Sequence, residues 1–138
     1  MSRIRPPDHT IQLRGPWTAL IDDSNGQRTV SLNIEGPTDW NSWFQGPGFS
    51  GRLVLQRRFN WTFPRQPPDL VELVVRGRLP EVILLNGEPI GILPANGGCT
   101  AVITERLGPS NLVSLQFDLV DFKDDHNLLE SVSLIARG

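Results

Sequence analysis

The chain has 138 residues, of which 38% are apolar and 20% are charged, and these values are typical of one soluble domain with a hydrophobic core. The formal net charge of −2 gives no electrostatic basis for binding nucleic acid or an anionic membrane. No apolar run approaches the roughly 18 residues that a membrane span needs. The single cysteine, Cys99, excludes an internal disulfide.

Residues 1–9 predict an irregular N-terminal arm, because Pro6-Pro7 blocks a helix there. Residues 10–138 predict a single domain with no linker and no internal repeat. The arm carries basic residues but no apolar stretch, so it does not resemble a signal peptide. Together with the single cysteine, this favours a cytoplasmic location.

About ten short strands are expected, separated by turns that are rich in glycine and proline. In the clearest of them, Val113, Leu115 and Phe117 alternate with polar residues. No stretch keeps a helical period beyond one turn, which is expected at 105–107. The pattern therefore predicts an all-β fold, an antiparallel β-sandwich. The expected strands are 10–13, 17–21, 28–34, 51–62, 70–75, 82–85, 88–93, 100–104, 112–119 and 131–136.

Asn86-Gly87 predicts the turn of a tight hairpin. A type I′ turn needs positive φ at both central residues, and these two residue types tolerate it. Pro89 follows the turn and has no N–H to donate to a neighbouring strand. We therefore expect its N–H side to face solvent or a bulge.

The longest stretch without periodicity, 36–50, combines aromatic and polar side chains. Sugar sites need an aromatic face for the C–H surface of the ring and polar groups for the hydroxyls. A loop of this length is usually functional or covers the end of a core. Packing is favoured for Trp40, whereas Trp43 fits either role. The candidate ligand-binding residues are Asp39, Trp40, Asn41, Trp43 and Phe44 in this loop, and Arg57, Asn96 and His126 elsewhere.

Arg57 falls in phase with the inward-facing residues Leu55 and Phe59 of its expected strand. An inward arginine needs a carboxylate or carbonyl groups as partners. We expect a buried ion pair, for instance with Glu72 or Asp118, in preference to a contact with a ligand.

Acidic residues gather at 121–125, but they lack the context of a catalytic or metal site. Glycoside hydrolysis needs two carboxylates that face each other across the bond, and neighbouring acids on a loop are usually solvated turn residues. No nucleophile motif is present, so we expect that the chain is not an enzyme. Asp121, Asp124 and Asp125 could supply oxygens to a structural calcium ion, but hydrated turns are favoured and no cofactor is expected.

Six short motifs occur in the same order as in a known domain. They are Leu13-Arg14-Gly15-Pro16-Trp17, Pro37-x-x-Trp40, Arg57-Arg58-Phe59, Gly77 with Val82 to Gly87 and Gly91, Ile103-Thr104 to Asn111-x-Val113, and Val132-Ser133-Leu134. With these motifs the chain resembles the N-terminal sugar-binding jelly-roll domain of family 2 glycoside hydrolases, the β-galactosidase and β-glucuronidase group, over nearly its whole length. The resemblance implies a jelly roll of the galactose-binding-domain-like kind.

Three positions depart from the pattern of this family. Leu55 and Leu84 stand where the family usually has a tyrosine and another aromatic, and Val102 replaces an aspartate. The family's catalytic carboxylates lie in a barrel domain that this chain does not contain. The resemblance therefore implies sugar binding without support for hydrolysis.

Two functions of different classes remain open. The first is a non-catalytic carbohydrate-binding module that stands alone, without the hydrolase barrel. The second is a protein-interaction or structural β-sandwich that has lost the sugar site, which the missing aromatic residues favour. The expected partner is a carbohydrate or a protein, with no nucleic acid and no membrane, and the sequence assigns no oligomeric state.

Overall fold

The computed structural model describes residues 9–34, 40–44, 46–62, 68–123 and 128–137, without the side chain of Asn41. The described strands are β1 (His9–Gln12), β2 (Trp17–Asp23), β3 (Gly26–Leu32), β4 (Phe49–Asn60), β5 (Leu70–Gly77), β6 (Val82–Leu85), β7 (Glu88–Pro89), β8 (Leu93–Ala95), β9 (Gly98–Val102), β10 (Ser110–Phe122) and β11 (Leu129–Arg137). A five-residue helix, α1 (Trp40–Phe44), and one 3-10 turn, Thr104–Arg106, accompany them.

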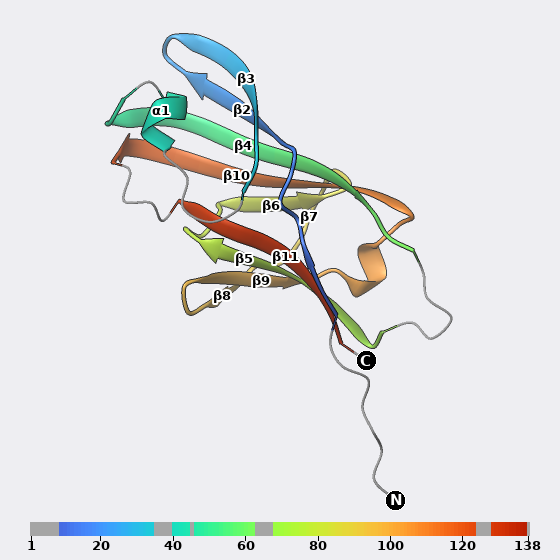
Figure 1. Cartoon of the computed structure of the whole chain (residues 1–138). Coiled ribbons are helices and arrows are strands. Elements are labelled where there is room, and N and C mark those ends of the chain that lie inside the picture. Colours follow the sequence, from blue (N-terminus) through green and yellow to red (C-terminus); the bar gives the residue numbers. More distant parts are fainter. Residues whose placement is uncertain (1–8, 35–39, 45, 63–67, 124–127, 138) are drawn as a thin grey trace, which may run out of the picture.

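The strands form two antiparallel sheets that pack face to face (Figure 1). The five-stranded sheet has the order β1-β11-β5-β9-β8, and the six-stranded sheet has the order β3-β2-β4-β10-β6-β7. The predicted all-β sandwich is therefore confirmed. No helix in the described ranges is long and apolar enough to cross a membrane.

The hydrophobic core lies between the sheets and follows the alternation of the central strands. Leu53 and Leu55 of β4 pair with Phe117 and Leu115 of β10, and all four side chains are fully buried. Trp17 is also fully buried, and its indole Nε1 donates to the carbonyl of Leu13 (2.7 Å), which satisfies its one polar atom. The period-2 pattern of the sequence thus places the core correctly.

The predicted hairpin at Asn86-Gly87 is confirmed. These residues have φ values of 54° and 84°, and β6 pairs with β7 on either side of them. Strand β7 is the outermost strand of its sheet, so Pro89 occupies an edge position where no ladder donor is required. The expected strand 88–93 is shorter, because the chain leaves β7 at Pro89 and starts β8 of the other sheet at Leu93.

Two other local expectations differ from the structure. The stretch 36–50 contains α1, which is too short to show a helical period in the sequence. Of the predicted arm, residues 1–8 lie outside the described residues, and His9 is the first residue of β1.

Candidate ligand-binding site

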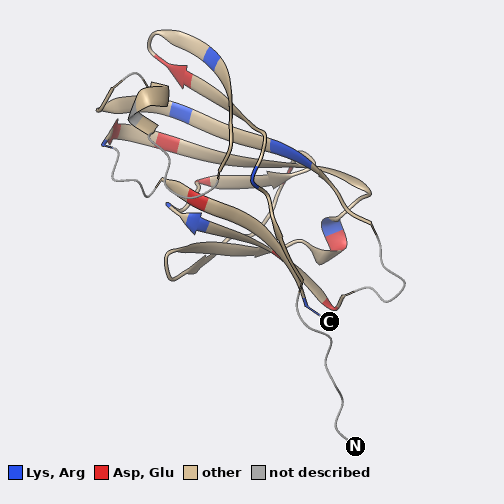
Figure 2. Cartoon of the chain, viewed as in Figure 1, with Lys and Arg blue, Asp and Glu red and all other residues tan. Residues whose placement is uncertain are grey.

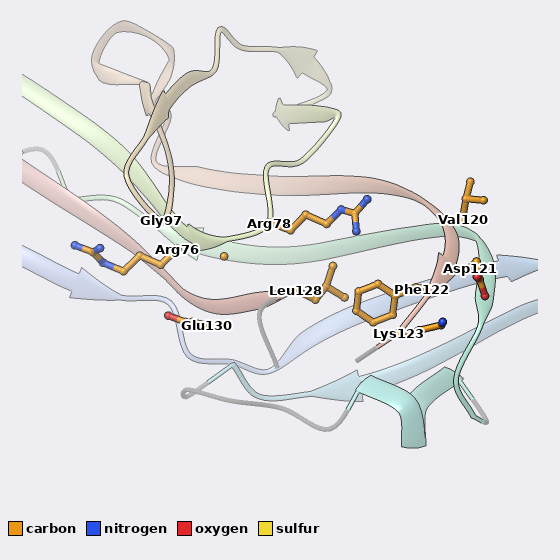
Figure 3. Close-up of a pocket in the computed structure, with 10 residues that line it drawn as sticks. Arg76, Arg78, Gly97, Val120, Asp121, Phe122, Lys123, Leu128 and Glu130 are labelled. Carbon is orange, nitrogen blue, oxygen red and sulfur yellow. The ribbon is translucent and has the colours of Figure 1, made fainter. Parts of the chain in front are cut away.

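A pocket of about 480 Å³ opens at the end of the sandwich where β5 and β10 end and β11 begins (Figure 3). We call it the loop-end pocket. Its wall consists of residues 76–78, Gly97, residues 120–123, and Leu128 with Glu130. Basic, acidic and apolar residues line it together, so it is more polar than the mostly apolar clefts that bind most small molecules.

Backbone hydrogen bonds join the segments of one wall of the pocket. The N–H of Gly77 donates to the carbonyl of Gly97 (2.8 Å), and the N–H of Arg78 donates to the carbonyl of Leu128 (3.0 Å). Gly77 has a φ of +131°, and a Cβ there would lie 2.8 Å from the carbonyl oxygen of Leu128. A glycine is therefore required for the close approach of these two segments.

A β-bulge shapes the opposite wall. The pairing of β10 with β4 shifts register between Leu119 and Phe122. Within the bulge, Asp121 has a φ of 49°, and its N–H donates to Oγ of Ser50 (2.9 Å). Bulges re-aim side chains and are common beside functional sites. Here Phe122 turns into the core (6% exposed), whereas Val120 is 84% exposed.

An aromatic cluster lies behind Phe122 and includes two of the predicted sugar-binding residues. Phe122 meets Phe44 edge-on at 5.7 Å between centroids, and Phe44 stacks on Phe49 at 4.2 Å and on Trp40 at 6.1 Å. Trp40 and Phe44 are buried, so their rings pack in the core and offer no face to a ligand. Trp43 is half-buried against the core and keeps part of its ring at the surface.

The charged side chains of the loop-end pocket have no protein partners within the part of the chain that the structure describes. Arg76, Arg78 and Lys123 form no ion pair there, and neither do Asp121 and Glu130. Four arginines elsewhere do form ion pairs: Arg28 with Asp23, Arg52 with Asp118, Arg106 with Glu88 and Arg137 with Glu72.

Arg57 does not belong to the loop-end pocket, and the predicted ion pair is wrong. Glu72 pairs with Arg137 (3.4 Å) and Asp118 with Arg52 (2.9 Å). The guanidinium of Arg57 instead donates to two carbonyls, those of Arg58 (3.0 Å) and Gly15 (3.5 Å). The side chain is only half-buried and reaches backbone acceptors at the open side of the sandwich, but its Nε is buried and has no hydrogen-bond partner among the described residues.

Some of the other predicted residues lie at or near the loop-end pocket, and the rest lie outside the described residues. Asn96 is exposed in the β8–β9 turn, directly before Gly97 of the loop-end pocket. Asp39 and His126 lie outside the described residues, as do the predicted calcium ligands Asp124 and Asp125; the third such ligand, Asp121, lies at the pocket rim. Within the described ranges, no three His, Cys, Asp or Glu residues are grouped in a way that could hold a metal ion.

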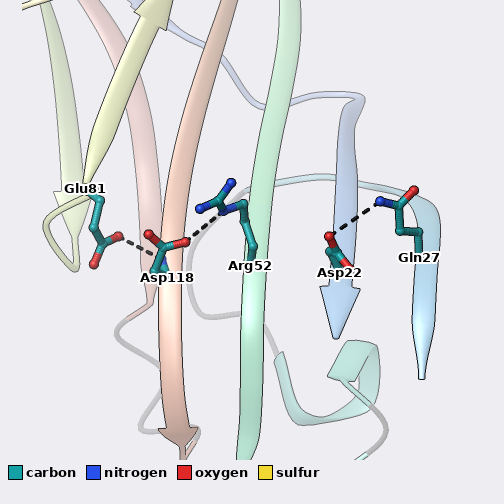
Figure 4. A network of polar contacts seen from close by, with 5 residues as sticks. All are labelled: Asp22, Gln27, Arg52, Glu81 and Asp118. Atoms are coloured by element: carbon teal, nitrogen blue, oxygen red, sulfur yellow. Dashed lines mark hydrogen bonds and ion pairs between the residues drawn. The ribbon is translucent and has the colours of Figure 1, made fainter. Parts of the chain in front are cut away.

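A second group of charged side chains lies on the outer face of the six-stranded sheet, and its members form hydrogen bonds and an ion pair with one another (Figure 4). The carboxylate of Asp118 accepts from Arg52 Nε (2.9 Å), and the N–H of Asp118 donates to Glu81 (2.9 Å). Figure 2 shows basic and acidic segments interspersed over both sheets, in agreement with the small net charge. The cross-strand pair thus gives Arg52 and Asp118 a partner of opposite charge on this face.

Comparison with known proteins finds similarity only to solved structures, because no family model and no curated protein matches the chain. The FMN-binding β-glucuronidase from Faecalibacterium prausnitzii L2-6 is 18% identical with a TM-score of 0.66, and the match covers 93% of this chain and 22% of that enzyme. A β-glucuronidase from Ruminococcus gnavus is 14% identical (TM-score 0.66, 99% and 30% covered). A rhamnosidase from Novosphingobium sp. PP1Y is 13% identical (TM-score 0.61, 98% and 16% covered).

The chain has the fold of a domain within these enzymes. The jelly roll of the family 2 glycoside hydrolases, which the sequence motifs predict, is thereby confirmed as the fold. The chain spans less than a third of each of these three enzymes, with 30% as the largest share.

The basic residues of the loop-end pocket were not predicted from the sequence. Arg76 and Arg78 flank a glycine at the end of an apolar strand, and Lys123 follows the long strand β10. The break from apolar to basic residues at both strand ends is a signal in the sequence. Only the jelly-roll topology, however, brings these ends to the same pocket.

Proposed function

We propose that this jelly roll is a non-catalytic carbohydrate-binding module and that the loop-end pocket is its site. The observation that carries the proposal is the pocket itself, whose rim combines charged side chains with the exposed apolar side chain of Val120, while Phe122 and Leu128 are buried beneath it. Sugars present apolar C–H surfaces and many hydroxyls, and a pocket of this kind complements both. The fold shared with domains of sugar-processing enzymes supports the same conclusion.

The absence of catalysis is part of the proposal. Asp121 and Glu130 both line the loop-end pocket, so two carboxylates do share one site. Both are exposed, however, and neither is enclosed in an apolar environment of the kind that prepares a general acid. We further propose that the site works without metal or cofactor and that the protein acts in the cytoplasm.

The proposal is tested by screening the protein on a glycan array and mapping any hit by NMR. We expect saturable binding, with shifts of the backbone amides of Gly77, Gly97 and Lys123. The indole signal of Trp43 serves as the control, because shifts centred there would move the site to α1. Chromogenic glycosides should release no product above the buffer rate. A folded protein that binds no glycan would contradict the proposal.

A protein-interaction or structural β-sandwich is the alternative, and exposed apolar side chains favour it. Leu93 of β8 is 61% exposed and Val102 of β9 is 49% exposed, at the edge of the five-stranded sheet. Exposed apolar groups at a sheet edge are common in interaction surfaces. If no glycan binds, sedimentation of the wild type and of the double variant Leu93→Ser/Val102→Ser tests self-association through this edge.

A further inference from the structure

Positively charged side chains outnumber negatively charged ones around the loop-end pocket. Three cations, Arg76, Arg78 and Lys123, surround it with two anions, Asp121 and Glu130, although the chain as a whole has a net charge of −2. Lys123 is the only lysine in the sequence. The lining therefore carries one more positive than negative charge, and its cations form no ion pair with the described residues.

The side chains differ in how they face the pocket. In Figure 3, Arg78 extends from the end of β5 over Leu128 and Phe122, toward Val120 and Asp121. Arg76 points the other way, near Glu130, so it contributes to the local potential more than to direct contact. An arginine that extends along a pocket in this way is well placed to bind an oxyanion, since its fork of N–H donors matches a carboxylate or a sulfate.

The acidic residues narrow the class of ligand. A bare inorganic anion has no hydrogen-bond donor for Asp121 and Glu130, which share the rim with the cations and only accept. Hydroxyl groups, in contrast, are good donors to carboxylates. A ligand that carries both an anionic group and several hydroxyls satisfies both kinds of side chain, and its C–H surface can contact the exposed Val120 at the rim.

We propose that the loop-end pocket binds acidic saccharides, that is, glycans with a carboxylate or a sulfate group, and that Arg78 and Lys123 contact this group. The inference rests on the proposed function, because it names the ligand class of the same site. It adds charge selectivity and the residues responsible for it.

The test uses a glycan array of matched pairs that differ in one acidic group: uronate-bearing glycans against their carboxyl-reduced forms, and sulfated disaccharides against unsulfated ones. We expect binding to the acidic members, and the two sets of pairs show whether carboxylate or sulfate is preferred. The acidic glycan with the strongest signal is then titrated by calorimetry. The double variant Arg78→Ala/Lys123→Ala should bind it at least about tenfold more weakly, because charge-assisted hydrogen bonds are lost.

The matched control is the double variant Arg14→Ala/Arg58→Ala, which removes the same net charge from exposed positions outside the loop-end pocket. Its affinity should stay within about twofold of the wild type, because screening limits the effect of distant charges. A second readout uses reductive methylation, which labels Lys123 and the N-terminus only. The dimethyl-lysine NMR signal should move on addition of the acidic glycan but not of its neutral partner.

The outcomes separate the two proposals. Equal binding of acidic and neutral members would overturn the charge selectivity and leave the carbohydrate-binding module standing. Acidic binding that the Arg78→Ala/Lys123→Ala variant retains would overturn the assignment to these residues. A folded protein that binds neither kind of glycan would overturn both.

Discussion

At the scale of single residues, Asn111 is a buried polar side chain at the centre of a hydrogen-bond network. It is 1% exposed, and its Oδ1 accepts from the N–H of Gly108 (2.8 Å) and from Asn86 Nδ2 (3.0 Å), while its Nδ2 donates to the carbonyl of Gly108 (2.8 Å). Asn86 in turn accepts from the N–H of Leu112 (2.8 Å). The network ties the predicted hairpin to the start of β10 and gives both polar atoms of the Asn111 side chain a partner.

We predict that Asn111→Ala lowers the free energy of unfolding by about 2–3 kcal/mol, because it leaves buried donors and acceptors without partners. Urea denaturation measures the loss. The exposed Asn60, at the end of β4, provides the control, and Asn60→Ala should change stability by less than about 0.5 kcal/mol. Equal effects of the two substitutions would contradict the structural role of the network.

The sequence predicts which side chains of a strand face the core, but it does not predict which residues they contact. The alternation in β4 correctly places Leu53, Leu55 and Phe59 in the core. It says nothing about what lies beside Arg57, since that depends on where the chain passes at Gly15. The carboxylates expected for Arg57 have arginine partners on their own neighbouring strands, which only the sheet register defines.

At the scale of elements, β9 is held so closely to β5 that one of its residues has no room for a side chain. Gly98 pairs with Arg76, and a Cβ at this position would collide with the carbonyl oxygen of Val75 and lie 2.9 Å from Cα of Arg76. Both are backbone atoms of a central strand, which cannot rotate away as a flexible side chain would.

We predict that Gly98→Ala destabilises the fold by about 1–3 kcal/mol, the cost typical of overpacking. Gly91→Ala is the matched control, because no neighbouring atom lies within 4 Å of the point that a Cβ would occupy there and its φ is not in the left-handed region. Chemical denaturation should show a lower midpoint for the first variant and little change for the second. Similar midpoints would mean that β9 can move away from β5 at little cost.

The elements that the sequence predicts well are those with a strong local signal. Asn86-Gly87 determines its own turn, and the alternation of Val113, Leu115 and Phe117 determines the buried face of β10. Helix α1 carries no such signal, because five residues make little more than one turn. The loop-end pocket could not be predicted from the sequence either, since its walls come from segments separated by up to 54 positions, from Arg76 to Glu130.

At the scale of the whole molecule, Cys99 reports on whether the sandwich opens as a unit. It is the only cysteine, it is 1% exposed, and it lies in β9 opposite Val75 of β5. Burial raises the pKa of its thiol, so the reactive thiolate is less populated in the folded state than in the unfolded chain. Reaction with a thiol reagent therefore requires that the two sheets separate or that the β8–β9 edge detaches.

We predict that the native protein at about pH 8 reacts with Ellman's reagent far more slowly than the protein in denaturing urea, and that the rate follows the population of unfolded chain. Gly98→Ala should then accelerate labelling by the factor that its loss of stability implies, whereas Gly91→Ala should not. Labelling of the wild type that is fast and independent of urea would show instead that β8 and β9 open locally, beside Gly97 of the loop-end pocket, without unfolding of the sandwich.

The burial of Cys99 also predicts how stability depends on pH. Because the pKa of the thiol is raised in the folded state, the free energy of unfolding should fall as the pH rises past the ordinary range of a thiol. Cys99→Ala should remove that decline.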